Sequence, residues 1–139
     1  MISFNVYISL RNIRRKAMAA APSPLGIIPV LPSLDIERDL KWYEKYAGFT
    51  YCFGNNGYAG LKRENLEFHL QFHHGNAEDP ITGGSVMKIF VADIKPYFQE
   101  FMERGTITKE KLRMNTPWGT HEFGFYDLNH NAIFVVQDV

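Results

Sequence analysis

The sequence predicts an α+β fold built from two tandem β-α-β-β-β modules, whose curved mixed sheets surround a cleft. Leu-Asp-Ile at residues 34–36 and Ala-Asp-Ile at residues 92–94 each open a stretch with apolar residues at helical spacing. A strand-like run precedes each stretch and short strand-like segments follow it, so the chain contains an internal repeat. We expect the cleft to lie where the two sheets meet.

Composition limits the classes of protein to which this chain can belong. Hydrophobic residues make up 45% of its 139 residues, which is typical of a globular domain with its own core. An aromatic content of 14% suits a dense core or an aromatic-lined pocket. A formal net charge of zero argues against general nucleic-acid binding. The single cysteine, Cys52, favours a reducing, cytoplasmic compartment, and the sequence has no apolar run of the ~18 residues that a membrane span needs.

The first predicted helix begins after Asp35 and ends before Gly48. Asp35 is a favourable N-cap residue, and a glycine is the usual residue in the left-handed position after a helix. Apolar residues recur between them at the spacing of one helix face. These residues are Ile36, Leu40, Tyr43 and Ala47. The pattern therefore predicts an amphipathic helix that packs on a sheet.

Four short strands accompany this helix. The first, residues 27–31, contains one proline and precedes another, which disfavours an interior place in the sheet. Residues 49–53 and 58–61 flank an Asn-Gly turn, a strong hairpin signal. Residues 66–72 alternate apolar and polar side chains, as expected of a strand with one buried face.

The second module repeats this order after a polar, turn-rich connector at residues 75–84. Residues 86–91 are its first strand. Asp93 caps a second amphipathic helix, which ends at Gly105. The last three strands are predicted at residues 112–115, 122–126 and 132–137.

Residues 1–25 differ in composition from the rest and are interpreted as a flexible N-terminal extension. Basic residues cluster there and are followed by alanine, proline and serine. A targeting peptide is an alternative, but the apolar residues 2–10 precede the charges, which reverses the order of a signal peptide. Met18 as the natural start is another alternative. The rest forms a single domain over residues 26–139, with module one at 26–74, the connector at 75–84 and module two at 85–139.

Several short patterns lie along the two modules. They are Pro-Val-Leu-Pro at residues 29–32, Asp-Ile at 35–36, Trp-Tyr at 42–43, Gly-Phe at 48–49 and Leu-Glu-Phe-His-Leu at 66–70. The last hairpin adds Pro-Trp-Gly-Thr-His-Glu-Phe at 117–123, with Asp127 and Asn131 downstream. Over about residues 27–137, the chain resembles the bleomycin-resistance-type proteins of the glyoxalase/bleomycin-resistance/extradiol-dioxygenase superfamily, which share the vicinal oxygen chelate fold.

The resemblance implies two half-open barrels and a homodimer in which modules of the two chains complete each other's cavity. It leaves the function open, because the superfamily includes metal-dependent enzymes and metal-free drug-binding proteins. The superfamily's four metal-ligand positions fall at Ile28, Glu67, Val86 and Phe134 of this chain. Only Glu67 can bind a metal, whereas a catalytic metal site needs about three nitrogen, oxygen or sulfur ligands. We therefore expect no metal and no cofactor.

A metal-free cavity binds by shape, stacking and a few polar anchors. Trp118 offers a flat stacking face, although it also suits a plug at the barrel mouth or a dimer contact. Lys88 is the one charge in an apolar strand, and we expect it to face the cavity as an anion anchor or as a partner of Glu67 or Glu122. His69 shares a strand face with Glu67 and Gln71. The Glu-His pair suits half a metal site, and the alternative is a half-exposed polar face of the strand. The candidate ligand-binding residues are Trp118, Lys88, Glu67, His69, Arg113, Glu122, Phe90 and Phe134.

Three hypotheses about function follow. The first is a metal-free protein that sequesters a bulky, partly aromatic small molecule, as in antibiotic resistance, with no catalytic residue and no nucleic-acid or membrane partner. The second is a superfamily enzyme with an altered or absent metal site. The third is a scaffold whose cavity is filled by Phe90 and Phe134 and binds nothing strongly.

Overall fold

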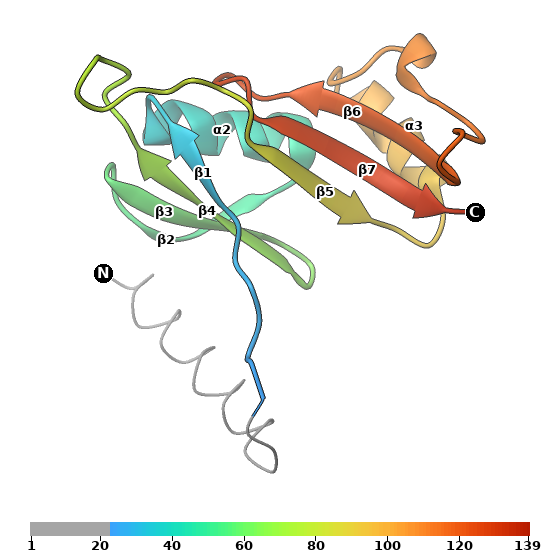
Figure 1. Cartoon of the computed structure of the whole chain (residues 1–139), viewed down its shortest axis with the longest axis horizontal. Coiled ribbons are helices and arrows are strands. Elements are labelled where there is room, and N and C mark those ends of the chain that lie inside the picture. The colour runs from blue at the N-terminus through green and yellow to red at the C-terminus, as the bar shows by residue number, and fades with distance from the viewer. Residues whose placement is uncertain (1–22) are drawn as a thin grey trace.

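The computed structural model describes residues 23–139, which form two mixed sheets and two α-helices (Figure 1). Module one consists of β1 (Val30–Ser33), α2 (Ile36–Ala47), β2 (Thr50–Gly54), β3 (Tyr58–Arg63) and β4 (Leu66–Phe72). Module two consists of β5 (Val86–Phe90), α3 (Ile94–Glu103), a 3₁₀ turn (Lys109–Lys111), β6 (Thr120–Tyr126) and β7 (Ala132–Asp138). The predicted α+β class and the repeat are confirmed, and the sheets are not closed. Most of the extension predicted over residues 1–25 lies outside the described residues.

The first sheet has the order β1-β4-β3-β2, with β1 parallel to β4 and the other neighbours antiparallel. β1 is an edge strand, so Pro32 needs no ladder hydrogen bond on its free side. Pairing with β4 begins at Val30, where it faces His69, so the strand starts three residues later than predicted. The edge position expected from the prolines is confirmed, but the expected bounds are wrong.

Helix α2 has the ends that the sequence predicts. The Asp35 carboxylate accepts a hydrogen bond from the backbone N–H of Arg38 at 3.0 Å. Gly48 follows the helix with a φ of 71°, in the left-handed region that favours glycine. The apolar stripe of α2 packs on the first sheet. Trp42 lies beside this stripe, against Tyr43 and Phe125.

The second sheet has the order β5-β7-β6. Asp93 caps α3 by accepting a hydrogen bond from Lys95 N–H at 3.1 Å. The strand predicted at residues 112–115 is wrong, because the structure has only one bridge there, between Arg113 and Glu122. The 3₁₀ turn precedes this bridge, and Asn115 follows it with a left-handed φ of 51°, so the extended run is too short for a strand.

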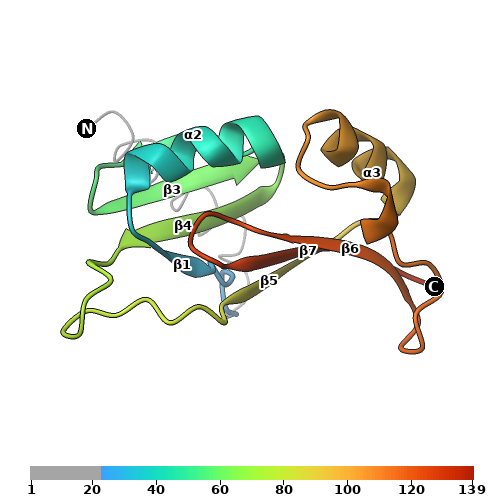
Figure 2. The same cartoon turned by 90° about the horizontal axis from the view of Figure 1, so that it is seen from above.

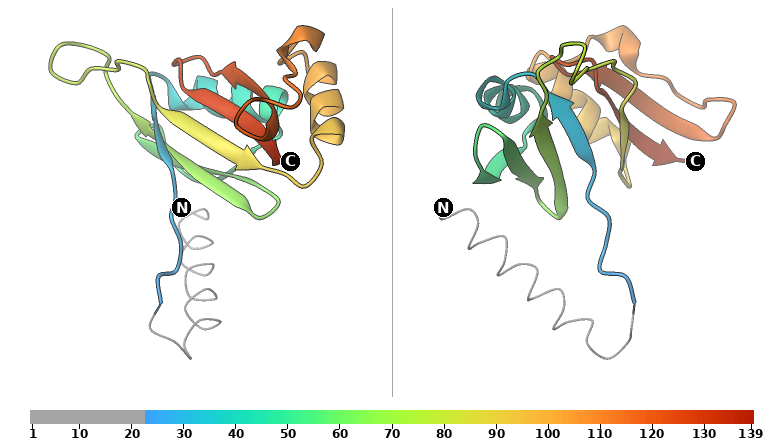
Figure 3. Two further views of the ribbon diagram at one scale, coloured as in Figure 1. Left: turned by 45° about the vertical axis from the view of Figure 1, so that its right-hand side comes forward. Right: turned by 60° about the vertical axis from the view of Figure 1, so that its left-hand side comes forward.

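Both helices cover the same side of the two sheets (Figure 2). One continuous core lies between these layers and joins the modules. Figure 3 shows the first strand of each module, β1 and β5, near the junction of the sheets, with the connector crossing between them. No helix within residues 23–139 is long and apolar enough to cross a bilayer.

Buried hydrogen bonds lock the last hairpin of module two to module one. The Tyr43 hydroxyl donates to the Asp127 carboxylate at 2.6 Å, and the Asn129 side-chain amide donates to Asp39 at 2.6 Å. Asn131 donates from its side chain to the carbonyl of Pro32 at 3.0 Å. The turn before β7 is therefore a structural joint between the modules.

A second joint lies at the C-terminal end of α2. Arg104 donates to the carbonyls of Glu44 and Lys45, and Arg63 donates to that of Ala47 at 2.9 Å. Glu100 of α3 accepts hydrogen bonds from both arginines, at distances from 2.5 to 2.8 Å. Burial raises the pKa of the Glu100 carboxyl, but these arginine contacts outweigh it and leave the pKa lowered.

Candidate ligand-binding site

Each sheet has one side against the helices and an opposite side, which we call its outward face. On the second sheet, cross-strand pairing arranges the outward face in rows. Three successive rows are Val86–Ala132–Tyr126, Lys88–Phe134–Gly124 and Phe90–Val136–Glu122–Arg113, and Asp138–Thr120 follows them at the end of the sheet. The alternating side chains, such as Met87 and Ile133, belong to the core. This outward face therefore collects most of the predicted ligand residues.

Large apolar side chains on or beside this face are unusually exposed. The exposed fractions are 57% for Val86, 60% for Phe90, 55% for Trp118 and 67% for Tyr126. Lys88 lies between Val86 and Phe90 and is also exposed. An apolar cluster of this kind at the surface of a chain is typical of a binding or assembly surface.

Trp118, Glu122 and Arg113 form a cluster at one end of the face. The Trp118 indole N–H donates to a Glu122 oxygen at 3.2 Å, and the Thr120 hydroxyl donates to the same oxygen at 2.9 Å. The other Glu122 oxygen lies 3.9 Å from the Arg113 guanidinium, whose centre is 5.0 Å from the Trp118 ring centroid. The left-handed Gly119, with a φ of 83°, turns the loop into β6 and so places Trp118 beside the strand.

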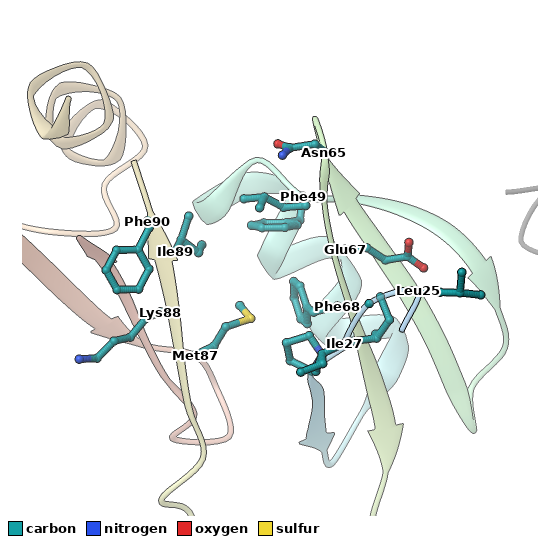
Figure 4. Close-up of a pocket in the computed structure, with 14 residues that line it drawn as sticks. Leu25, Ile27, Phe49, Asn65, Glu67, Phe68, Met87, Lys88, Ile89 and Phe90 are labelled. Carbon is teal, nitrogen blue, oxygen red and sulfur yellow. The ribbon is translucent and has the colours of Figure 1, made fainter. Parts of the chain in front are cut away.

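Phe134 and Lys88 occupy the middle row. Phe134 lies over Gly124 of the neighbouring strand, where a Cβ atom would come within 2.6 Å of its ring. The predicted pairing of Lys88 with Glu67 or Glu122 is not formed. Figure 4 shows Lys88 on the side of β5 away from Glu67. A hollow of about 380 Å³ remains on this face, lined in part by Arg113, Tyr126 and Phe134.

The outward face of the first sheet carries a different arrangement. The Tyr58 hydroxyl lies 2.6 Å from Nδ1 of His69, and Nε2 of His69 lies 3.1 Å from the Glu67 carboxylate. Lys62 is 3.8 Å from the other Glu67 oxygen. Since an ionised carboxylate only accepts, we assign the proton of neutral His69 to Nε2, so that Nδ1 accepts from Tyr58. The expected half-exposed polar face is found only at Gln71, which is exposed, because the side chains of His69 and Glu67 are only 4% and 3% exposed.

A cleft of about 390 Å³ lies where the two sheets meet, as the sequence predicted (Figure 4). Phe68 and Met87 point toward one another across it, from β4 and β5. Glu67, Lys88 and Phe90 also contribute to its lining, together with residues 25–29. The candidate residues thus lie at three places: the junction of the sheets, the outward face of the second sheet and, for His69, the outward face of the first sheet.

A metal centre has no support in the described part of the chain. Within residues 23–139, no three histidine, cysteine, aspartate or glutamate side chains gather so that they could hold a metal ion. Val86 and Phe134 stand at two of the superfamily's ligand positions, and Glu67 contacts His69 and Lys62 instead. The residues present do not fit a catalytic metal.

Sequence reasoning missed three contributors to these two faces. Tyr58 and Lys62 lie opposite Gln71 and Glu67 in the β3–β4 ladder, which places them beside His69. The Asn-Gly turn predicts that Tyr58 and Lys62 belong to a strand and point to the same face. It does not predict which residues of β4 lie opposite them. Thr120 was also missed, because the predicted strand began only at residue 122.

The comparisons with known proteins concern the fold of the chain. No protein-family model and no curated protein matches the sequence. Among solved structures, a bleomycin resistance determinant encoded on the transposon Tn5 matches 81% of this chain and 97% of its own, with 20% identity and a TM-score of 0.69.

Two further structures extend the comparison. A bleomycin-binding protein from Streptomyces verticillus, complexed with copper(II)-bleomycin, matches 83% of this chain and 97% of its own, with 20% identity and a TM-score of 0.68. A glyoxalase/bleomycin resistance protein/dioxygenase from Nocardioides matches 94% of this chain and 93% of its own, with 15% identity and a TM-score of 0.67. The fold expected from the resemblance is therefore confirmed.

Proposed function

With the fold of the bleomycin-resistance proteins as the premise, we propose that this protein binds and sequesters a bulky, partly aromatic small molecule without a metal ion. The observation that carries the proposal is the outward face of the second sheet. It exposes Phe90, Trp118 and Tyr126 beside the cations Lys88 and Arg113. Aromatic faces stack on planar ligands, and the cations supply polar anchors.

Glu122 supports the proposal because it fixes the stacking residue before any ligand arrives. Its carboxylate is 5% exposed and holds both the Trp118 indole N–H and the Thr120 hydroxyl. A ring that is already ordered loses less conformational entropy on binding. The zero net charge gives no strong attraction for a cationic drug, so bleomycin itself is not inferred as the ligand.

The proposal includes a homodimer in the cytoplasm and no nucleic-acid or membrane partner. β5 is an edge strand that carries the exposed Val86 and Phe90, and such edges are commonly covered in native assemblies. An obligate pair buries about 2,000 Å² or more in total. Sedimentation equilibrium at micromolar concentration should show a dimer, and a monomer would contradict this part of the proposal.

A catalytic role is the second candidate, favoured by the chain of contacts from Tyr58 through His69 to Glu67. Such a chain can move a proton from the phenol to the imidazole. The filled scaffold is less well supported, because hollows of about 390 and 380 Å³ remain next to Phe90 and Phe134, respectively. Conversion of a bound molecule that stops in His69→Gln would favour the enzyme over the sequestering protein.

A thermal-shift screen tests the binding proposal directly. Bleomycin, its copper complex and a panel of planar aromatic molecules are added to protein whose metal content has been measured. We expect at least one planar compound to raise the melting temperature of metal-free protein. One tightly bound transition metal per chain, or binding that depends on added metal, would contradict it.

The residues are tested on the compound that binds best. Trp118→Ala should weaken its affinity by roughly 1–3 kcal/mol, with little change in stability. Trp42→Phe is the matched control, because Trp42 packs on Tyr43 and Phe125 away from this face. If Trp118→Ala unfolds the protein or leaves the affinity unchanged, Trp118 is a structural plug.

A further inference from the structure

The geometry points to Arg113 as the residue that decides which charge class of ligand Trp118 accepts. Planar aromatic molecules with an acidic group are favoured, and those with a cationic group are rejected. The inference rests on the proposed function, since it names the ligand class for the same face. Its basis is the arrangement of Arg113, Trp118 and Glu122, in which a cation already occupies the aromatic ring.

Arg113 lies over the Trp118 ring, although 58% of its side chain is exposed to solvent. The centre of its guanidinium lies 5.0 Å from the ring centroid, within the range of a cation–π contact. Backbone hydrogen bonds in both directions between Arg113 and Glu122, at 2.8 and 2.9 Å, fix where the arginine leaves the chain. Its guanidinium also lies 3.9 Å from the Glu122 carboxylate. More than half of the Trp118 side chain is still exposed, so a ligand can stack on it.

A bare tryptophan ring attracts cations, because its faces carry negative electrostatic potential. Here the Arg113 guanidinium already lies over one face of the Trp118 ring and is attracted by that negative potential. A second cation stacked on the ring would be repelled by the charge of Arg113 on the other side of it. An acidic group at the edge of a stacked ligand is attracted by the same guanidinium, which has a planar set of donors suited to carboxylates.

The other charges near the ring are mostly positive. Lys111 lines the hollow beside Arg113, and Lys88 lies in the adjacent row of the face. Glu122 is buried and already accepts hydrogen bonds from Trp118 and Thr120. Asp138 lies opposite Thr120 and is exposed, so the face presents three cations and one exposed carboxylate to a ligand.

The test compares two probes of the same shape and opposite charge, 2-naphthoate and 2-naphthylmethylammonium. Their dissociation constants are measured by protein-detected NMR on the whole chain, with the Trp118 indole N–H as the reporter. We expect naphthoate to bind about fivefold or more tightly than the ammonium probe. Arg113→Gln should reduce this ratio about fivefold or more, and it should strengthen binding of the ammonium probe in absolute terms.

Lys111→Gln is the matched control, because it removes the same charge from the hollow without touching the ring. It should change the ratio by less than about twofold. Arg113→Lys keeps the charge and provides a second variant if Arg113→Gln does not fold, and it should retain the preference for naphthoate. An unchanged ratio in folded Arg113→Gln, or an equal effect of Lys111→Gln, would overturn this inference alone. If neither probe binds wild-type protein up to its solubility limit, both the inference and the binding role of Trp118 fail.

Discussion

The two sheets share a fold but present opposite chemistry on their outward faces. The first holds a buried polar chain from Tyr58 through His69 to Glu67, whereas the second exposes Phe90 and Trp118 beside cations. The sides that face the helices are alike, because both supply apolar residues to one core. The repeat therefore determines the architecture of each module, and its outward residues determine what each module can do.

The same packing contact occurs on both outward faces, so its contribution to stability can be compared between the two sheets. In each sheet a phenylalanine ring lies over a glycine of the neighbouring strand. Phe53 covers Gly60 in the first sheet, and Phe134 covers Gly124 in the second. Phe53 is buried at 7% exposure, but Phe134 is only half-buried, so the same substitution should be felt differently in the two modules.

The largest expected effect comes from filling these two glycines. A Cβ at Gly60 would lie 2.0 Å from the Phe53 ring, and one at Gly124 would lie 2.6 Å from Phe134. Gly60→Ala should destabilise the protein by about 2–3 kcal/mol, since a buried ring has nowhere to move. Gly124→Ala should cost about 1 kcal/mol, because Phe134 can swing outward. Urea unfolding measures both, and equal losses would show that the two faces are packed alike.

A smaller effect is expected from removing one polar group on each face. Tyr58→Phe deletes a hydroxyl 2.6 Å from buried His69 and should cost about 1–2 kcal/mol of folding free energy. Trp118→Phe deletes an indole N–H on an exposed ring and should cost less than about 0.5 kcal/mol. Thermal unfolding of the two variants compares them, and a larger loss for Trp118→Phe would reverse the assignment of structural and binding faces.

The last effect concerns Glu100, which contacts both modules, so that its replacement should not distinguish one module from the other. Its pKa is lowered in the folded protein, so its contribution is present above the usual glutamate pKa and is lost as the pH falls through the lowered value. Glu100→Gln should cost about 1 kcal/mol at neutral pH, after allowance for solvent screening. The difference from wild type should shrink below about pH 4. Urea unfolding across this pH range tests the sign, and a difference that grows in acid would contradict it.

The sequence allowed most of the fold to be predicted, because its signals are local. Asp35, Gly48 and Asp93 mark helix ends through their own backbone chemistry, and alternation defines β4. The start of β1 and the strand at residues 112–115 were predicted wrongly, since pairing with distant strands decides both.

For the candidate site, the sequence suggested individual residues but not the contacts between them. Trp118, Arg113 and Glu122 were each chosen for their residue type, but their mutual contacts depend on the register of β6 with the segment around residue 113. The burial of His69 depends on neighbours from other strands, so its local alternation could not reveal it.

We propose that the outward face of the second sheet, and not that of the first, binds planar molecules. Fluorine NMR of protein labelled with 5-fluorotryptophan tests it with two signals, from Trp118 and Trp42. On titration with 2-naphthoate, the Trp118 signal should move and saturate while the Trp42 signal stays in place. The His69 imidazole signals are followed in parallel by proton–nitrogen NMR. A saturating shift of these signals with Trp118 unmoved would contradict the proposal and assign binding to the first sheet.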